Sequence, residues 1–246
     1  MKIGIPRALL YYRYHALWST FFQELGLEVV TSPPTVKSIF ESGISLALSE
    51  VCLPVKLYLG HVEWLLGKVD YLFVPRILRV ENSPRPRYTC PKTMGLPDFV
   101  RSSFDSLPAL IDPDVDLSRG PLKVVFQSLG ALFEKDRRKV SRAFELALKS
   151  QREYEGDLLR DRGFKETEPT GSSPGRNSVV ISLVGHPYIL FDPYLNVGIV
   201  DKLKSLGAKV VSQFSIPGSK IENELAKYEE ISWTYEREIV GSVSHF

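Results

Sequence analysis

The sequence has few cysteines, no long apolar run and almost no net charge. Two cysteines in 246 residues are too few for a disulfide framework. No apolar run approaches the roughly 18 residues that suggest a membrane-spanning helix, so we expect no membrane segment. A formal net charge of +2 gives no reason to expect nucleic acid or an anionic membrane surface as a partner. Gly4, Pro6 and Arg7 interrupt the amino terminus where a signal peptide would be apolar, so we expect a cytoplasmic protein.

The motifs of several common enzyme classes are also missing. There is no GxxxxGK motif followed by serine or threonine, and no GxGxxG after an expected strand, which disfavours nucleotide hydrolysis and classical dinucleotide binding. The GxSxG elbow of serine hydrolases is absent as well. The four histidines are scattered, so a zinc site has little support. The remaining picture is an ordinary globular protein without a self-evident active site.

Strand–helix–strand units occur twice in the sequence. Residues 2–6 form a short apolar run, a helical pattern follows as far as Gly26, and residues 27–32 are typical of a second strand. The same order recurs over residues 177–214. Strand, helix and strand in this order make a βαβ unit, in which the two strands are parallel. The sequence therefore predicts an α/β fold with parallel sheets.

A segment rich in glycine, serine and proline, residues 163–178, has no apolar pattern and is the best candidate for a domain boundary. We predict a first α/β domain at residues 1–162, a linker at 163–178, and a second α/β domain at 179–246. The second domain shows only two expected strands. Two strands are too few to close a core, so we expect this domain to be incomplete.

The region between the two βαβ units holds a strand, a loop and a helix. Residues 70–77 are apolar throughout, which predicts a buried strand. Residues 78–97 contain four prolines, so we predict a long irregular loop, and loops of this length often bind ligands or cofactors. Residues 121–160 show a long helical pattern with one apolar side.

The two cysteines occur in similar local settings. A proline follows Cys52 (EVCLPVK) and Cys90 (YTCPK) within two positions, and we expect a helix to start near each. Unpaired backbone N–H groups at a helix start stabilise a thiolate and can donate to the sulfurs of an iron–sulfur cluster. Lys56 and Lys92 add positive charge near the two thiols. No CxxC spacing is present, so on the residues alone buried structural cysteines and cluster ligands both stay open.

Two histidines are candidate pocket residues. His61 lies on the helix expected after Cys52, and His186 follows an expected strand in the motif GHPY. Ligands of α/β proteins bind at the carboxyl ends of the strands, which favours a binding role for His186. The same residue can equally cap the neighbouring helix.

Five segments together resemble one protein family. They are IGIPRALLYYRYHALWSTFFQELGLEVVTS, SEVCLPVKLYLGH, DYLFVPRI, YTCPKTMGLPD and VGHPYILFDPYLN, in the order in which the family has them. The family is that of the 2-hydroxyacyl-CoA dehydratase-like iron–sulfur proteins, in the branch related to acyl-CoA dehydratase activases. The resemblance implies Rossmann-like domains that hold an iron–sulfur cluster of the 4Fe–4S or double-cubane type.

The resemblance also implies roles for the cysteines. Cys52 and Cys90 match the first two cysteines of the family and would be cluster ligands. Family members usually continue into a third cysteine, which this sequence lacks, and a cluster ordinarily needs more than two thiolates. We therefore expect this chain to be isolated without its cluster.

By the same resemblance, the protein takes part in low-potential electron transfer. It would receive an electron from an ATP-dependent activase or reductase and deliver it to a small substrate or an acyl-CoA, as a reductase or dehydratase component. Because phosphate-binding loops are absent, we do not expect it to be the ATPase itself. A homodimer is a candidate assembly. Two alternatives are a non-catalytic scaffold or cluster-assembly partner, and a cluster-free binding module whose pocket is lined by GHPY.

Overall fold

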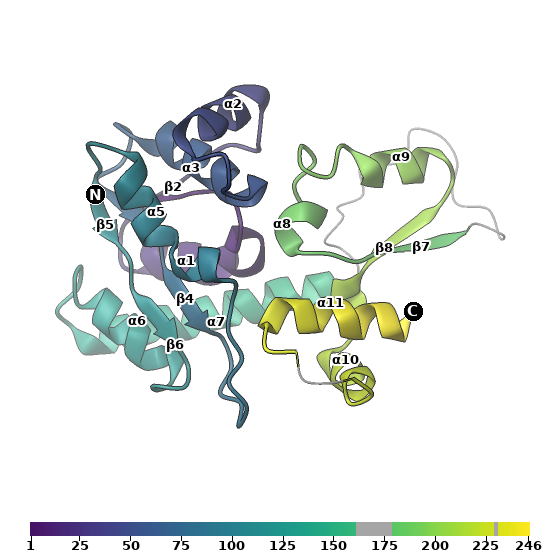
Figure 1. The fold of residues 1–246 in the computed structure, drawn as a ribbon. Coiled ribbons are helices and arrows are strands. Elements are labelled where there is room, and N and C mark those ends of the chain that lie inside the picture. Colours follow the sequence, from purple (N-terminus) through teal and green to yellow (C-terminus); the bar gives the residue numbers. More distant parts are fainter. Residues whose placement is uncertain (161–178, 229–230) are drawn as a thin grey trace. The chain divides into compact units, whose positions relative to one another are not determined.

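The computed structural model describes residues 1–160, 179–228 and 231–246 (Figure 1). The predicted linker at 163–178 lies outside these residues, so the domain boundaries drawn there stay predictions. No helix within the described ranges has the length and apolar character needed to cross a bilayer.

The chain forms two compact units. The first contains Met1–Gln151 together with Ser232–Thr234, and the second contains Arg152–Ile231 together with Tyr235–Phe246. A short segment near the carboxyl end therefore belongs to the unit that is otherwise built from the amino-terminal part of the chain.

The main sheet of the first unit has four parallel strands in the order β2-β1-β3-β5. Its strands are β1 (Lys2–Ile5), β2 (Glu28–Thr31), β3 (Tyr71–Phe73) and β5 (Ala109–Ile111). In β1, Ile3 pairs with Val29 of β2 on one side and with Tyr71 of β3 on the other. The predicted α/β fold with parallel, Rossmann-like sheets is confirmed.

Prolines interrupt two of these strands. Past Pro75 the chain continues from β3 into β4 (Arg76–Arg79), and past Pro113 it continues from β5 into β6 (Asp114–Asp116), which pairs in parallel with β4. Proline has no N–H group to give to a sheet. The prediction of one strand over 70–77 was therefore wrong at Pro75.

Seven helices belong to this part of the chain. They are α1 (Tyr11–Glu24), α2 (Lys37–Leu46), α3 (Leu53–Leu65), α4 (Pro91–Met94), α5 (Leu96–Ser103), α6 (Leu122–Gly130) and α7 (Arg137–Leu159).

Two of the sequence predictions for this region need correction. The helix expected over 121–160 is two helices, because the Asp136 carboxylate accepts a hydrogen bond from the Arg138 N–H (2.8 Å) and starts α7 anew. The loop expected over 78–97 contains α4, since Pro91 stands at the first helical position, where proline is favoured.

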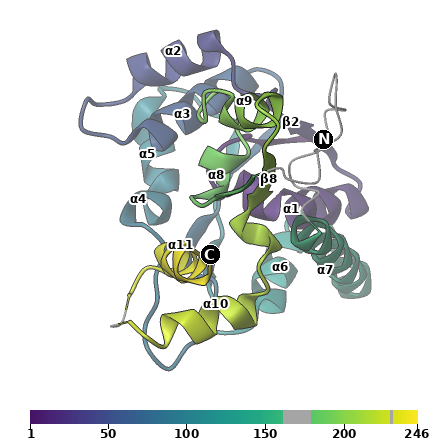
Figure 2. The same ribbon diagram turned by 90° about the vertical axis from the view of Figure 1, so that its right-hand side faces the viewer.

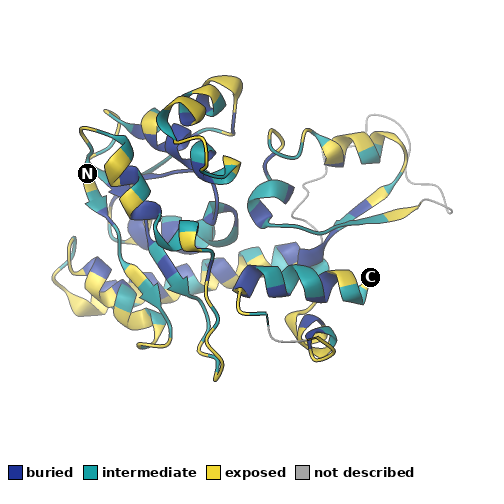
Figure 3. Cartoon of the chain, in the orientation of Figure 1, coloured by how far each residue is buried: buried dark blue, intermediate teal, exposed yellow. Residues whose placement is uncertain are grey.

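The core of the first unit lies against the main sheet (Figure 3). Aromatic side chains fill much of it in edge-to-face contacts, with ring centroids 5.0 Å apart for Phe22 and Phe73 and 4.7 Å apart for Phe21 and Phe126. The largest fully buried side chains come from β1, α1, α3 and β3 and include Ile3, Ile5, Phe21, Phe22, Leu57, Leu59, Leu65 and Leu72.

The second unit has a parallel pair of strands, β7 and β8. Its elements are β7 (Val180–Leu183), α8 (Pro187–Leu190), α9 (Ile199–Ser205), β8 (Lys209–Ser212), a 3-10 turn η1 (Gln213–Ser215), α10 (Gly218–Leu225) and α11 (Thr234–His245). The end of α7 supplies Leu158 to a small core with Leu190 and Phe214. Helices α10 and α11 lie side by side (Figure 2), and the Arg237 guanidinium pairs with Glu222 at 3.0 Å.

The second unit repeats a structural detail of the first. In both, a glycine with positive φ ends the helix before the second strand, Gly26 at 81° and Gly207 at 82°. The residue just after that strand then accepts a hydrogen bond from the loop after the first strand. Ser32 Oγ accepts from the Arg7 N–H (2.8 Å), and Gln213 Oε1 accepts from the Gly185 N–H (2.9 Å).

Helices α2 and α3 cross with their backbones in close approach at two glycines. A Cβ on Gly43 would overlap the carbonyl oxygen of Lys56, and a Cβ on Gly60 would overlap the carbonyl oxygen of Ile39. The obstacle is backbone in both cases, so no side-chain rotation can relieve it. Only glycine at both positions allows this crossing.

We predict that Gly43→Ala and Gly60→Ala each lower the free energy of unfolding of the first unit by about 3 kcal/mol, the upper end of the usual cost of overpacking. All three tryptophans, Trp18, Trp64 and Trp233, lie in this unit, so their fluorescence in a urea titration reports its unfolding. The control is Gly95→Ala in the same unit, where φ is −84° and a Cβ would lie 3.4 Å or more from its nearest neighbours. Equal midpoints for all three variants would contradict the close crossing.

Candidate functional site

The carboxyl ends of β1 and β3 form the topological switch point of the main sheet. From β1 the chain passes through α1 to β2 on one side, and it later returns to β3 on the other side of β1. Open α/β sheets bind ligands in the crevice at such a point. This edge of the sheet is therefore the first place to look for a site.

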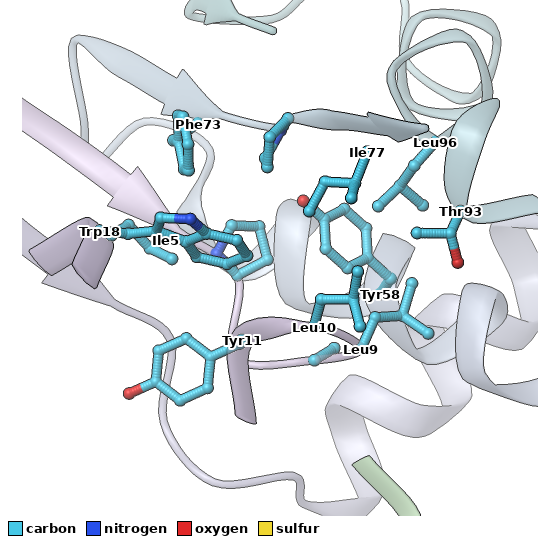
Figure 4. A pocket seen from close by; sticks show the side chains of 13 residues that line it. Ile5, Leu9, Leu10, Tyr11, Trp18, Tyr58, Phe73, Ile77, Thr93 and Leu96 are labelled. Carbon is cyan, nitrogen blue, oxygen red and sulfur yellow. The ribbon is translucent and has the colours of Figure 1, made fainter. Parts of the chain in front are cut away.

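A small hollow lies at this edge (Figure 4). Its lining comes from the end of β1 and the loop after it, from α1, from the end of β3 through β4, and from α3, α4 and the start of α5, and it is mostly apolar. The polar side chains among the lining residues are Tyr11, Trp18, Tyr58 and Thr93. The hollow has room for roughly one water molecule, so it marks where these segments converge and is not itself a cofactor cavity.

Two residues of this hollow, Leu9 and Tyr58, were not among the predicted site residues. Leu9 is buried in the loop after β1 with a φ of 50°, a left-handed conformation that is strained for leucine. Tyr58 of α3 is buried, and its burial raises the pKa of the phenol, which therefore stays protonated. The signal that points to Leu9 is its position directly after the first strand, where Rossmann-like folds place ligand-binding loops.

Cys52 and Cys90 occupy equivalent positions at the starts of two helices. Each is the residue before the first helical residue, Cys52 of α3 with φ −66° and ψ 150° and Cys90 of α4 with φ −56° and ψ 137°. The Cys52 carbonyl accepts from the Val55 N–H (3.0 Å), and the Cys90 carbonyl accepts from the Thr93 N–H (2.8 Å). Both thiols are free and half-buried.

Both cysteines lead into helices that reach the hollow. Cys90 precedes the lining residue Thr93 by one turn, and Cys52 precedes the lining residue Tyr58 by six residues, which is about 9 Å of helix. Helices α3 and α4 thus each contribute a residue to the lining of the same hollow. That the two thiols share one cluster stays a prediction.

The two lysines near the thiols differ in their setting. The Lys56 ammonium donates to the Ser49 carbonyl oxygen (3.1 Å), in the loop that leads to Cys52. Lys92 lies half-buried in α4, two residues after Cys90. Both are in place to add positive charge at the starts of these helices.

His61 is fully buried in α3 and joins this helix to the chain after β2. Its Nδ1 lies 2.9 Å from Ser32 Oγ, and its Nε2 lies 3.0 Å from Thr35 Oγ1. In a neutral imidazole one nitrogen donates and the other accepts, so two hydroxyl groups suit it well. His61 does not line the hollow.

His186 lies in the second unit, whereas the other five predicted site residues lie in the first. It precedes α8 with φ −61° and ψ 144°, close to the conformation of the two cysteines. Its ring stacks on that of Tyr188, and its Nε2 lies 3.8 Å from Glu236 Oε1 of α11. Burial lowers the pKa of His186, and the Glu236 carboxylate partly opposes this.

No three His, Cys, Asp or Glu side chains converge as metal ligands within the residues that the structure describes. The sequence holds two cysteines in all. Cys52 and Cys90 together can therefore supply two of the four thiolates that a cubane cluster ordinarily uses.

One protein-family model matches residues 2–216, and its description is "CoA enzyme activase uncharacterised domain". The chain belongs to this family. The match confirms the expected relation to acyl-CoA dehydratase activases, and it leaves the iron–sulfur chemistry as a proposal. No curated protein and no solved structure matches the chain.

We predict that His61→Ala lowers the free energy of unfolding by about 2–4 kcal/mol, because it opens a cavity and takes a buried partner from two hydroxyl groups. Urea titration with tryptophan fluorescence measures the loss. The control is His15→Ala, at a half-buried position of α1, which should lower the free energy of unfolding clearly less. An unchanged midpoint for His61→Ala would mean that the residue serves a ligand and not the fold.

A second prediction concerns His186. Because its folded-state pKa lies below the unfolded value near 6.5, the neutral ring stabilises the fold above that pH. This contribution is lost as the pH falls from about 6.5 through the lowered pKa. Glu236→Gln should lower the pKa of His186 further, since it removes the opposing carboxylate. An NMR titration of the imidazole checks this, and a rise in the variant would contradict it.

Proposed function

We propose that this domain carries an iron–sulfur cluster on the thiolates of Cys52 and Cys90 and works in low-potential electron transfer in an acyl-CoA dehydratase activase system. The observation that carries the proposal is the matched placement of the two free cysteines. Each stands at a helix start in the same backbone conformation, and both helices reach one edge of a parallel sheet.

The chemistry of the two positions supports this use. Thiolate sulfur is the protein ligand that iron–sulfur clusters take, and half-buried thiols are partly shielded from water. Pro54 and Pro91 have no N–H group, and the Val55 and Thr93 N–H groups already bond to the cysteine carbonyls. The N–H groups of Leu53 and Lys92, each close in sequence to a cysteine, are therefore the candidate donors to sulfur. Lys56 and Lys92 offset part of the negative charge that two thiolates bring.

A bound cluster would supply one-electron chemistry at a low potential. The chain's own part is to hold two ligands in fixed positions and to restrict access of water to them. Cys52 and Cys90 leave further cluster ligands to be supplied, and a second copy of the chain is one source of them. We further propose an ATP-dependent activase or reductase as the electron source and a small substrate or an acyl-CoA as the acceptor, and the family's relation to CoA enzyme activases is compatible with this.

The test is anaerobic reconstitution of the 246-residue chain with iron and sulfide, followed by gel filtration. We expect the reconstituted wild type to retain iron and sulfide in a defined ratio with cluster absorbance, with two cysteines from each of two copies of the chain as ligands. Cys52→Ser or Cys90→Ser should reduce retention at least about tenfold, because each variant leaves one thiolate per copy. The double variant Cys52→Ser/Cys90→Ser is the control for iron that adheres non-specifically.

Three outcomes would contradict the proposal. Wild type that retains no more iron than the double variant would favour a cluster-free binding module. Retention that survives loss of one cysteine would show that the other ligands lie elsewhere. Retention without any reduction of an acyl-CoA or small substrate would favour the scaffold or cluster-assembly role.

A further inference from the structure

Tyr88, two residues before Cys90, is held by a segment from the far end of the sequence. The Tyr88 N–H donates to the Ser232 carbonyl (2.9 Å), and the Thr234 N–H donates to the Tyr88 carbonyl (2.9 Å). Together these bonds make a parallel β-bridge between Tyr88 and Trp233. Both main-chain groups of Tyr88 are thus bound to residues more than 140 positions away in the chain.

The residue between Tyr88 and Cys90 is fixed on the other side. Thr89 is fully buried, its N–H donates to the Leu78 carbonyl (2.9 Å), and its hydroxyl donates to the Ile77 carbonyl. Arg79, at the end of the same strand β4, lies over the Tyr88 ring, 4.6 Å from its centroid. The two residues that precede Cys90 therefore bond to β4 on one side and to Ser232–Thr234 on the other.

The segment Ser232–Thr234 leads directly into α11. Thr234 is the first residue of that helix, whose remainder belongs to the second unit. Thr234 thus donates this hydrogen bond from the first position of a helix whose other residues belong to the second unit. Among the residues that the structure describes, the hydrogen bonds next to Cys52 stay local: the Val51 N–H donates to the Leu48 carbonyl, and the Lys56 ammonium donates to the Ser49 carbonyl.

We infer that Ser232–Thr234 is a positioning segment for Cys90: its β-bridge to Tyr88 fixes the thiol, so that the setting of Cys90, and not that of Cys52, depends on this segment. This inference rests on the proposed function only in taking Cys90 as a functional thiol. A redox site built from two cysteines would then have one ligand held within its own unit and one held through the carboxyl-terminal segment.

The structure offers a matched pair of variants for the test. Thr234→Pro removes the N–H that bonds Tyr88, and it does so at the first helical position, where proline is tolerated. Thr234→Ala removes the hydroxyl group and keeps the N–H. Iodoacetamide alkylation of the native protein, followed by mass spectrometry of the two cysteine peptides, gives a separate rate for each thiol.

We expect Thr234→Pro to raise the alkylation rate of Cys90 about fivefold, the factor in local opening that corresponds to one backbone hydrogen bond. The rate of Cys52 should not change, and Thr234→Ala should leave both rates at the wild-type value. An unchanged Cys90 rate in Thr234→Pro overturns the inference, as does an equal rise in both thiols of a folded variant.

If Thr234→Pro fails to fold, an experiment on the wild type tests the inference instead. In increasing urea below the unfolding midpoint, Cys90 alkylation and hydrogen exchange at the Tyr88 and Thr234 amides should rise together. Cys90 that reacts while these amides stay protected overturns the inference. None of these measurements involves iron, so a failure of cluster binding and a failure of the positioning segment give different results.

Discussion

The Ser32 hydroxyl group ties together three segments of the first unit at the carboxyl edge of its sheet. It accepts a hydrogen bond from the Arg7 N–H in the loop after β1, and it contacts the buried imidazole of His61 in α3. A buried polar group without partners costs free energy, so each member of this junction requires the others. The junction sets the loop after β1 against α3, and both of these line the hollow at the switch point.

Three predicted site residues stand at helix starts, two in the first unit and one in the second. Cys52, Cys90 and His186 all precede a helix in an extended conformation, each with a proline within two positions. A residue at this position lies next to the first turn of a helix. The helix dipole at that end favours negative charge or a hydrogen-bond acceptor. The repeat of the Arg7–Ser32 bond as Gly185–Gln213 shows that both units arrange their first loop in the same way.

Much of the fold could be predicted from the sequence because its signals are local. The apolar runs at β1, β2 and β8, and the glycines at 26 and 207, mark the βαβ units without reference to the rest of the chain. The features that escaped prediction are tertiary. The Gly43–Gly60 crossing needs two helices in contact, and the break before α7 depends on one carboxylate in a pattern that otherwise continues.

The candidate site was predicted in part for the same reason. The prolines that follow Cys52 and Cys90 predict helix starts, and the structure confirms both, at α3 and α4. The role of His61 could not be seen, since its partners Ser32 and Thr35 lie 29 and 26 residues away. Nor could the attachment of Tyr88 to Ser232–Thr234, which joins distant segments through main-chain groups and leaves no trace in side-chain pattern.

That attachment has a consequence for how the protein is made. A ribosome completes residues 1–151 long before it reaches Ser232. Until then the main-chain N–H and carbonyl groups of Tyr88 lack the partners that Ser232 and Thr234 provide in the folded protein. At ordinary rates of synthesis this interval lasts several seconds or more. During it the main-chain groups of Tyr88 are open to water and to chaperones. Synthesis of Ser232–Thr234 then supplies their partners.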